Sequence, residues 1–429
     1  MDLALSDYRG ALEYLFARTT GAFKFGLERT RALLAEMRDP HLEIPTLHIA
    51  GTNGKGSCVA TAEAILRAKG LRVARYTSPH LVDFRERIVV AGTPISPDEV
   101  VAFIQRWTPA IERIGASFFE ATTAMAFLHF ARERADVSLI ETGLGGRLDS
   151  TNVVAPRAAG VVSIGYDHQE YLGPTLESIA AEKAGIFKHG APAVIGEREE
   201  EVAAWLATAA RRAGASAVRV VRAETSVTDV SVDASGTSFM LHALGESARV
   251  RTPLAGRHQA ANFAFTLCLL DAAGPPFETM LADAAAAAPT IRLPGRMQQV
   301  GRWIFDVAHN ADGARTLAAT VGAIVGRAPV TVVLCALADK DWRAMLEALQ
   351  PIARRFLLTD APTAPVGRRW SLPEAAVAAS RLGVEVRAIP DFDAALAEAS
   401  SYAERTLVTG SFHTVGDAMA RLQVSPLTG

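Results

Sequence analysis

One stretch of the sequence reads His48-Ile49-Ala50-Gly51-Thr52-Asn53-Gly54-Lys55-Gly56-Ser57, and it lies between an apolar run and a helical pattern. Its three glycines allow the backbone to turn tightly, so that amide groups point at phosphate oxygens. We expect the helix to begin near Ser57 and to add the positive end of its dipole. Lys55 would neutralise phosphate charge, and the Ser57 hydroxyl would bind Mg²⁺. The stretch therefore predicts a nucleotide site formed by residues 51–57.

This stretch departs from the usual phosphate-loop pattern G-x-x-x-x-G-K-[ST]. Ile49 stands where the first glycine belongs, and Gly56 intervenes between Lys55 and Ser57. The alternative interpretation is a glycine-rich turn from strand to helix that binds nothing. A strand before the turn, a helix after it and a lysine inside it favour nucleotide binding.

Outward from this turn, short apolar runs alternate with amphipathic stretches. Strands are expected at residues 46–50, 72–77, 137–142 and 159–164, with helices at 57–69 and 119–133. Such alternation is typical of an α/β fold with a parallel, doubly wound sheet. Residues 227–250 differ, because short alternating runs with turn residues there predict a small antiparallel sheet.

A second alternating series begins near residue 297. Its expected strands are 303–307, 330–336, 355–359, 384–389 and 406–409. The stretch 288–296 before it contains two prolines and a glycine, which predicts a linker. We therefore divide the chain into domains at 1–290 and 297–429, with ligands expected at strand carboxyl ends and between the domains.

The charge balance argues against several classes of partner. The 44 Lys and Arg residues nearly cancel the 46 Asp and Glu residues, which predicts no nucleic-acid footprint and no basic membrane patch. The three cysteines are far apart, as expected in a reducing cytoplasm. Asp2, Asp7 and Glu13 interrupt the first apolar stretch, so it does not resemble a signal peptide.

Further motifs occur in a characteristic order along nearly the whole chain. They read TSPHL (77–81), FRERI (84–88), ETGLGGRLD (141–149), DH (167–168), EKAGI (182–186), GRHQ (256–259), PGR (294–296), DVAHN (306–310) and GSFH (410–413). With these motifs the chain resembles the folylpolyglutamate synthase and dihydrofolate synthase family of the Mur ligase superfamily. The resemblance implies a P-loop ATPase domain joined to a smaller Rossmann-like C-terminal α/β domain. It also implies an activity: ATP phosphorylates a substrate carboxylate, and the amine of glutamate attacks the acyl phosphate.

The resemblance also implies metal ligands and a modified lysine. Glu141 resembles the shared magnesium ligand; Ser57 would hold one Mg²⁺, and Ser78 and His168 would hold a second. Lys183 resembles a lysine that is carbamylated in the family, which requires a neutral amine and hence a lowered pKa. From the sequence alone, Glu141 would be an ordinary strand-end carboxylate, His168 a turn histidine and Lys183 a solvated lysine.

Residues of the C-terminal half complete the implied catalytic site. Arg296 would reach the phosphates when the domains close, as an arginine finger does. Asp306 and His309 resemble ATP-contacting or glutamate-site residues, and Asn262 resembles an adenine contact. Lys340 and Ser411 are weaker candidates for closing the glutamate site. The alternatives are a linker salt bridge for Arg296 and a helix N-cap for Asp306.

Four segments resemble the bifunctional bacterial type, which uses dihydropteroate as well as folates. Residues 25–29 (FGLER) and 117–120 (SFFE) resemble segments near the pterin site, so Leu27, Ser117 and Phe119 are candidate substrate contacts. The sequences of residues 306–310 and 410–415 also agree with that type. Ser117 stands where threonine is expected, and Phe119 could equally be a core residue.

Three other functions remain open from the sequence. The first is a Mur-type ligase for another acid and amino acid, although no uridine-nucleotide domain precedes Gly51. The second is a P-loop switch or transport ATPase, which would hydrolyse ATP without glutamate. The third is a non-catalytic relative, although Lys55, Glu141 and Lys183 are all present. We expect a monomeric cytoplasmic enzyme that uses ATP and Mg²⁺.

Overall fold

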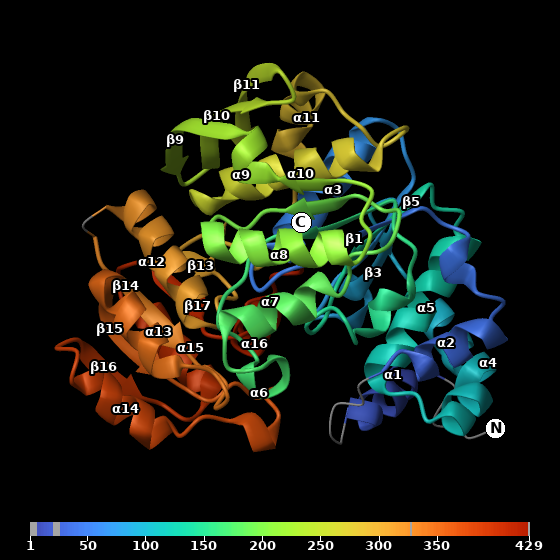
Figure 1. The fold of residues 1–429 in the computed structure, drawn as a ribbon. Coiled ribbons are helices and arrows are strands. Elements are labelled where there is room, and N and C mark those ends of the chain that lie inside the picture. Colours follow the sequence, from blue (N-terminus) through green and yellow to red (C-terminus); the bar gives the residue numbers. More distant parts are fainter. Residues whose placement is uncertain (1–6, 20–25, 327, 428–429) are drawn as a thin grey trace.

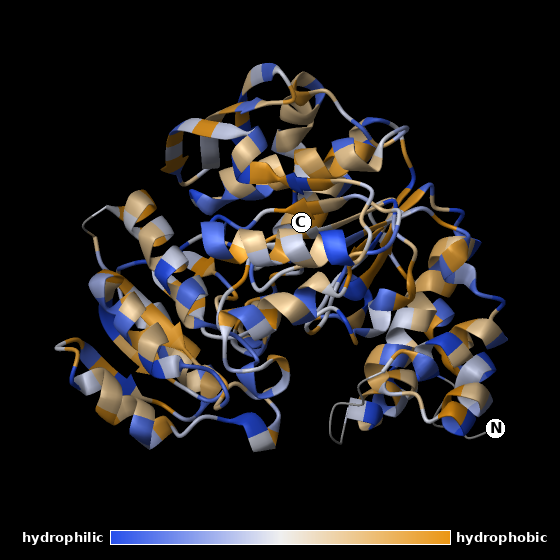
Figure 2. Cartoon of the chain, viewed as in Figure 1, coloured by the Kyte–Doolittle hydropathy of each residue, from blue (hydrophilic) through white to orange (hydrophobic). Residues whose placement is uncertain are grey.

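In the part of the chain that the structure describes, the strands form three sheets of eight, three and six strands. The structure is a computed structural model, and it describes residues 7–19, 26–326 and 328–427. The sheets occupy different regions of Figure 1, with the three-stranded sheet at the top and the six-stranded sheet at the lower left. The strands of the eight-stranded and six-stranded sheets are mostly orange in Figure 2, whereas the three-stranded sheet and the outer helices show mixed colours.

The eight-stranded sheet has the order β4-β3-β2-β5-β1-β6-β7-β8. The strands are β1 (Thr46–Ala50), β2 (Val73–Tyr76), β3 (Ile88–Val90), β4 (Thr93–Pro94), β5 (Val137–Glu141), β6 (Ala158–Val161), β7 (Ala193–Ile195) and β8 (Val218–Val220). All pair in parallel except β3 and β4, which form an antiparallel edge. Because β1 is central, with β5 and β6 on its two sides, the strand order reverses there, where doubly wound sheets bind ligands.

Helices cover both faces of this sheet, as the alternation along β1 requires. Leu47 and Ile49 belong to the core that packs under α3 (Lys55–Ala68) and α10 (His258–Ala273). Ala50 belongs to the core on the opposite face. The other helices of this part are α1 (Tyr8–Phe16), α2 (Glu28–Glu36), α4 (Pro97–Ile114), α5 (Phe118–Arg132), α6 (Gln169–Leu172), α7 (Leu176–Ala184), α8 (Glu200–Arg212), α9 (Val221–Glu224) and α11 (Leu281–Ala287).

The three-stranded sheet is antiparallel, as the sequence predicts. It consists of β9 (Ser226–Asp233), β10 (Gly236–Ala243) and β11 (Glu246–Thr252). Phe239 and Leu241 on the central strand are fully buried and join the core that contains α10. The sheet therefore extends the first core and has no separate core of its own.

The six-stranded sheet has the order β12-β13-β17-β14-β15-β16, and only β12 is antiparallel to its neighbour. Its strands are β12 (Gln298–Val300), β13 (Trp303–Phe305), β14 (Val330–Leu334), β15 (Ala353–Leu358), β16 (Glu385–Ala388) and β17 (Thr406–Thr409). Its helices are α12 (Ala311–Val325), α13 (Trp342–Leu349), α14 (Leu372–Ser380), α15 (Phe392–Ser401) and α16 (Phe412–Arg421). A separate apolar core lies within this part.

The predicted strands are present, with small shifts at their ends. Helix α3 begins at Lys55, two residues before the predicted Ser57, so Lys55 and Gly56 belong to its first turn. Ala288 and Ile291, which lie in the predicted linker, are buried in the first core. The division at 290 and 297 stays a proposal. Within the described residues, no helix combines the length and the apolar character needed to span a membrane.

Candidate active site

The glycine-rich turn connects the carboxyl end of β1 to α3, and its glycines have conformations that few other residues adopt. Gly54 has φ 89°, and a Cβ atom there would lie 2.8 Å from the side-chain oxygen of Asn262. The Thr52 side chain holds the turn against the loop after β6, because its hydroxyl donates to the carbonyl oxygen of Gly165 at 3.1 Å. The amides of Thr52 and Asn53 donate to the carbonyl oxygen and the hydroxyl of Ser163, at 2.8 and 3.1 Å, so the amides open to a phosphate are those at the start of α3, which have no acceptor within the helix.

Two lysines converge on the carbonyl oxygen of Gly51. Lys55 Nζ donates to it at 2.9 Å, and Lys183 Nζ donates to it at 3.2 Å. Burial lowers the pKa of Lys183 to about 7, and the charge of Lys55 contributes in the same direction. Lys183, only 5% exposed, is therefore not the solvated lysine of the simplest sequence interpretation.

Glu141 ends β5 and lies beside the glycine-rich turn. It is 6% exposed, and burial raises the pKa of its carboxyl group. The Lys55 ammonium is 3.9 Å from Oε1, and the backbone amide of Ser78 donates to Oε2 at 3.3 Å. A Cβ atom at Gly56 would lie 4.0 Å from Oε2, so the helix start approaches this carboxylate.

The donor set in this region fits Mg²⁺. Within the described part of the chain, no three His, Cys, Asp or Glu side chains form a cluster that could hold a metal ion. Glu141 and the buried hydroxyl residue Ser57 offer few protein oxygens, as expected for Mg²⁺ that retains waters and binds substrate phosphates. Burial lowers the pKa of His168 to about 4, which leaves its imidazole neutral and able to act as a ligand.

Asp167 joins the loop after β6 to the C-terminal sheet. Its carboxylate forms a close ion pair with the Lys340 ammonium. His309 Nε2 lies 3.4 Å from Oδ2, and Asn310 Nδ2 donates to the same oxygen at 3.3 Å. These partners, together with the more distant His168, hold the pKa of Asp167 far below its usual range, although burial alone would raise it.

His309 and Asn310 follow β13 and lie close to the glycine-rich turn. The Nδ1 atom of His309 donates to the carbonyl oxygen of Val307 at 3.0 Å, because a carbonyl can only accept. Asn310 caps α12 by accepting from the amide of Gly313 at 2.7 Å. It also donates to the side chain of Asn53 at 3.2 Å, which links the two halves of the chain at this site.

The contacts of Arg296 and Asp306 differ from the two structural alternatives, a linker salt bridge for Arg296 and a helix N-cap for Asp306. Asp306 accepts from the amides of Met297 at 3.0 Å and Ala308 at 2.9 Å, and it caps no helix. The Arg296 guanidinium lies 5.7 Å from the ring centre of Phe412. It lowers the carboxyl pKa of Asp306, which burial raises overall.

Asn262 lies on α10, behind the glycine-rich turn. It is 7% exposed, and its amide nitrogen donates to the side chain of Gln259 at 3.0 Å. Gln259 in turn contacts His258 Nε2 at 2.9 Å. These three side chains offer the hydrogen-bonding edge expected of an adenine contact.

Of the predicted substrate residues, Ser117 and Phe119 lie at the start of α5, and the Phe119 ring packs against Gly143, two residues after Glu141. Ser117 caps α5, because its hydroxyl accepts from the amide of Glu120 at 3.4 Å. The Phe119 ring lies 6.1 Å from that of Tyr76, and a Cβ atom at Gly143 would clash with it. Leu27 is half-buried at the start of α2, whereas Phe25 lies outside the described residues.

Ser411 lies in the other half of the chain, away from these residues in the sequence. It caps α16 by accepting from the amide of Thr414 at 3.0 Å and is 2% exposed. The structure therefore places it at the carboxyl end of β17, which pairs with the strand that precedes Asp306.

The comparisons with known proteins agree with this arrangement. The sequence matches the Mur ligase middle domain over residues 49–270 and the Mur ligase glutamate ligase domain over residues 295–412. It is 33% identical to the dihydrofolate synthase/folylpolyglutamate synthase of Bacillus subtilis (strain 168), over 97% of this chain and 99% of that protein. The chain belongs to this family of Mur ligases.

Solved structures give the same result. Escherichia coli FolC in complex with DHPP and ADP has a TM-score of 0.87 at 31% identity and covers 99% of both chains. A bifunctional folylpolyglutamate synthase/dihydrofolate synthase with Mn, AMPPNP and L-glutamate bound has a TM-score of 0.85 at 31% identity, over 98% of this chain and 99% of that chain. The predicted family, the α/β fold class and the enzyme class, an ATP-dependent ligase, are confirmed.

The sequence alone says little about some residues of this Mur ligase site. Asp167 and Asn310 lie within motifs that assign them no role, and Lys340 is only a weak candidate. Each lies in a loop after a strand, which is a usable signal. Their convergence joins positions up to 173 residues apart, and no local pattern contains that information.

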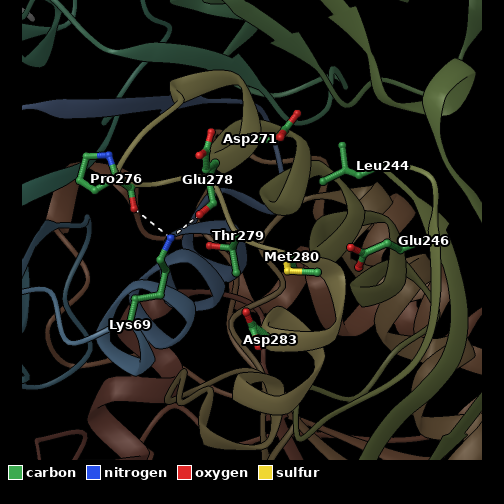
Figure 3. A pocket seen from close by; sticks show the side chains of 9 residues that line it. All are labelled: Lys69, Leu244, Glu246, Asp271, Pro276, Glu278, Thr279, Met280 and Asp283. Atoms are coloured by element: carbon green, nitrogen blue, oxygen red, sulfur yellow. Dashed lines mark hydrogen bonds between the residues drawn. The ribbon is translucent and has the colours of Figure 1, made fainter.

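One pocket of the described structure lies elsewhere and has a volume of about 460 Å³. It is lined by Lys69, Leu244, Glu246, Asp271, Pro276, Glu278, Thr279, Met280 and Asp283. Figure 3 shows the Lys69 ammonium directed at the backbone carbonyls of Pro276 and Glu278. No predicted site residue lines this pocket.

Proposed function

We propose that the protein joins the amine of L-glutamate to the carboxylate of a folate-type acceptor, with ATP converted to ADP and phosphate. The observation that carries the proposal is the convergence of Lys55, Lys183 and Glu141 around Gly51. Lys55 begins the helix that follows β1, and Glu141 is the last residue of the adjacent parallel strand β5. Lys183 lies in the last turn of α7. A second group, His309 and Lys340, approaches the same sheet edge from the C-terminal half through Asp167.

The reaction has two steps on this arrangement. An oxygen of the acceptor carboxylate bonds to the γ-phosphorus of ATP while the bond to the ADP oxygen breaks. The glutamate nitrogen then bonds to the acyl carbon, loses its proton, and phosphate leaves. Both steps need alignment and charge neutralisation more than a covalent protein group. Lys55 and Arg296 neutralise the phosphoryl oxygens, and the amides of residues 51–57 orient them.

Mg²⁺, when bound, would neutralise phosphate charge and bring the two anionic reactants together. Glu141 and Ser57 would hold it, and Ser78 and His168 would hold a second ion. Glu141 has two roles in this proposal. It binds metal, and through the amide of Ser78 it fixes the loop after β2.

Lys183 is proposed to be carbamylated. Its neutral nitrogen bonds to the carbon of CO₂ and loses a proton, so that an ammonium is replaced by an anion. The lowered pKa of about 7 supplies the neutral amine. The change removes a repulsion between two buried cations at the Gly51 carbonyl and provides an oxygen ligand suited to Mg²⁺.

We propose that the acceptors are both dihydropteroate and reduced folates. Leu27, Ser117 and Phe119 lie on the α2 and α5 side of Glu141, where a flat pterin would meet an apolar face. Relatives described as bifunctional cover nearly the whole chain. Asn262 would contact adenine, and Asp306, His309 and Ser411 would form the ATP and glutamate side.

The cellular setting is also a proposal. The near-neutral charge and the three unpaired cysteines, which are all buried, suit a reducing cytoplasm and no nucleic-acid partner. We propose a monomer with one P-loop domain and one C-terminal domain, divided at residues 290 and 297.

The test is an amide-forming assay with purified protein, ATP, Mg²⁺ and labelled glutamate, read by mass spectrometry. Dihydropteroate and tetrahydrofolate are offered separately. A glutamylated product from both acceptors supports bifunctionality, and a product from one restricts the proposal to that acceptor. ATP turnover that needs neither glutamate nor an acceptor would instead indicate a switch or transport ATPase.

A further inference from the structure

A buried arginine without a carboxylate partner lies beside the predicted acceptor residues. Arg87 ends the 3₁₀ turn η4 (Phe84–Arg87) and is only 7% exposed. Its Nε atom donates to His80 Nδ1 at 2.8 Å. Among residues 7–19, 26–326 and 328–427, no Asp or Glu forms an ion pair with its guanidinium.

The nearest carboxylates are engaged by other groups. Glu86 accepts from the backbone amides of Leu81 at 2.9 Å and Val82 at 2.8 Å, which shapes the preceding loop. Glu141 is held by the amide of Ser78 and faces Lys55. Neither carboxylate contacts Arg87.

The other arginines of this segment show what the usual arrangement would be. Arg85, two residues away, is paired with Asp83 at 2.7 Å. Arg75 on β2 is paired with Glu63 at 2.9 Å. Arg87 is more buried than either, yet its direct partners are neutral: a histidine whose pKa burial lowers to about 3, the Tyr76 hydroxyl, and an aromatic ring.

A buried guanidinium stays protonated, because arginine does not lose its proton in proteins. Burial without a counter-ion is costly, so buried cations are normally paired. No ion pair with a described residue therefore balances the charge of Arg87, although the more distant charges of Glu86 and Glu141 act on it. An anionic ligand would balance it.

The position of Arg87 indicates which ligand this is. Its guanidinium carbon lies 5.2 Å from the ring centre of Phe118, the residue between Ser117 and Phe119. Ile88, the next residue, pairs with Tyr76, whose ring faces Phe119 at 6.1 Å. The cation thus lies among the aromatic side chains on the acceptor side of Glu141.

We infer that Arg87 binds a carboxylate oxygen of the acceptor substrate. The inference rests on the proposed function, because it takes a folate-type acid as the acceptor. Two carboxylates have the required chemistry: the reacting carboxylate of dihydropteroate, and the non-reacting α-carboxylate of a glutamyl folate. The planar guanidinium suits either one, since it can donate two parallel hydrogen bonds.

The test compares each acid with its uncharged analogue. Calorimetry in the presence of Mg²⁺ and AMPPNP measures the affinity of dihydropteroate, its carboxamide and tetrahydrofolate for wild type, Arg87→Gln and Arg87→Lys. Arg85→Gln is the matched control, because it removes a paired cation from the same turn. Arg87→Gln should weaken acid binding about 10- to 100-fold, as expected for loss of a charged hydrogen bond, and should leave the carboxamide almost unchanged.

The pattern of losses identifies the carboxylate. Weakened dihydropteroate indicates the reacting carboxylate, and weakened tetrahydrofolate alone indicates the non-reacting one. Equal losses for acid and carboxamide, or no loss, overturn the inference and leave the proposed function standing. If Arg87→Gln does not fold, the same comparison is made with Arg87→Lys. Equal losses of affinity for acid and carboxamide in that variant likewise overturn the inference. A wild type that binds none of the three ligands overturns the proposed function and the inference together.

Discussion

Lys55 and Lys183 share one acceptor, the carbonyl oxygen of Gly51, although both side chains are cationic at low pH. Such an arrangement is unfavourable without a nearby anion, and Glu141 at 3.9 Å from Lys55 balances only part of the charge. Triphosphate and a carbamate would complete the balance. The charges around Gly51 therefore favour a reaction of anionic substrates that is assisted by a metal ion.

Removing either principal contact should abolish activity without unfolding the protein. Lys55→Ala and Glu141→Ala should each lower kcat by about 10³-fold or more, because each removes a phosphate or metal contact. Lys69→Ala is the matched control, since Lys69 follows the other end of the same helix. Steady-state kinetics with ATP and Mg²⁺ decide, and a near-normal kcat in either site variant would contradict the assignment.

Carbamylation of Lys183 should depend on pH in a specific direction. With a pKa of about 7, about a tenth of the amine is neutral at pH 6 and about nine tenths at pH 8. Protein stripped of CO₂ at acid pH should therefore regain activity faster at pH 8 than at pH 6 when both samples receive the same concentration of dissolved CO₂, which is the reacting species. Equal recovery rates at the two pH values would argue against the carbamate.

The Lys183→Ala variant gives a second test of the same group. It should be nearly inactive, and acetate should partly restore its activity by placing an anion in the vacated space. Acetate should not rescue Lys55→Ala, where the missing group is a cation. Full activity of Lys183→Ala without acetate would return Lys183 to a structural role.

At the scale of single elements, the start of α5 combines a cap with a predicted substrate contact. Ser117 and Ser96 both form capping boxes, with Glu120 and Glu99 respectively. Each Ser→Ala change should lower the free energy of unfolding by about 1 kcal/mol. Only Ser117→Ala should also raise KM for dihydropteroate. Equal KM values for the two variants would show that Ser117 is a cap alone.

The sequence predicted individual elements well where their own residues determine them. The buried parallel strands β1, β5 and β14 are short runs of mostly apolar residues, which the pattern shows directly. It did not predict β3 and β4, because strands of three and two residues carry almost no periodicity. The sequence predicts that α3 begins near Ser57, two residues after its actual start at Lys55, because glycines weaken the helical pattern of the first turn.

At the scale of the whole molecule, the candidate active-site groups come from both halves of the chain. Asp167 pairs with Lys340 across 173 positions, and Asn310 contacts Asn53 across 257. Local patterns cannot predict such pairs, because the pairs exist only after the two sheets pack together. The resemblance to a family placed Arg296 and His309 near the site, but it gave no role to Asp167.

Arg296 should act on the reaction more than on nucleotide binding. If it stabilises the transferring phosphoryl group in the closed enzyme, Arg296→Ala should lower kcat by about 10²-fold or more with little change in the Kd for ATP. Arg292→Ala is the control, because Arg292 is exposed and donates only to backbone carbonyls nearby. A change confined to the Kd for ATP would make Arg296 a ground-state contact.

The central claim is that the acceptor carboxylate becomes an acyl phosphate before glutamate attacks. Its most direct test uses dihydropteroate labelled with ¹⁸O in the carboxylate, together with ATP, Mg²⁺ and glutamate. The two-step chemistry predicts that each phosphate released carries one ¹⁸O atom, detected by mass spectrometry, and that release requires both acceptor and glutamate. Unlabelled phosphate, or phosphate released at the same rate without the acceptor, would contradict it.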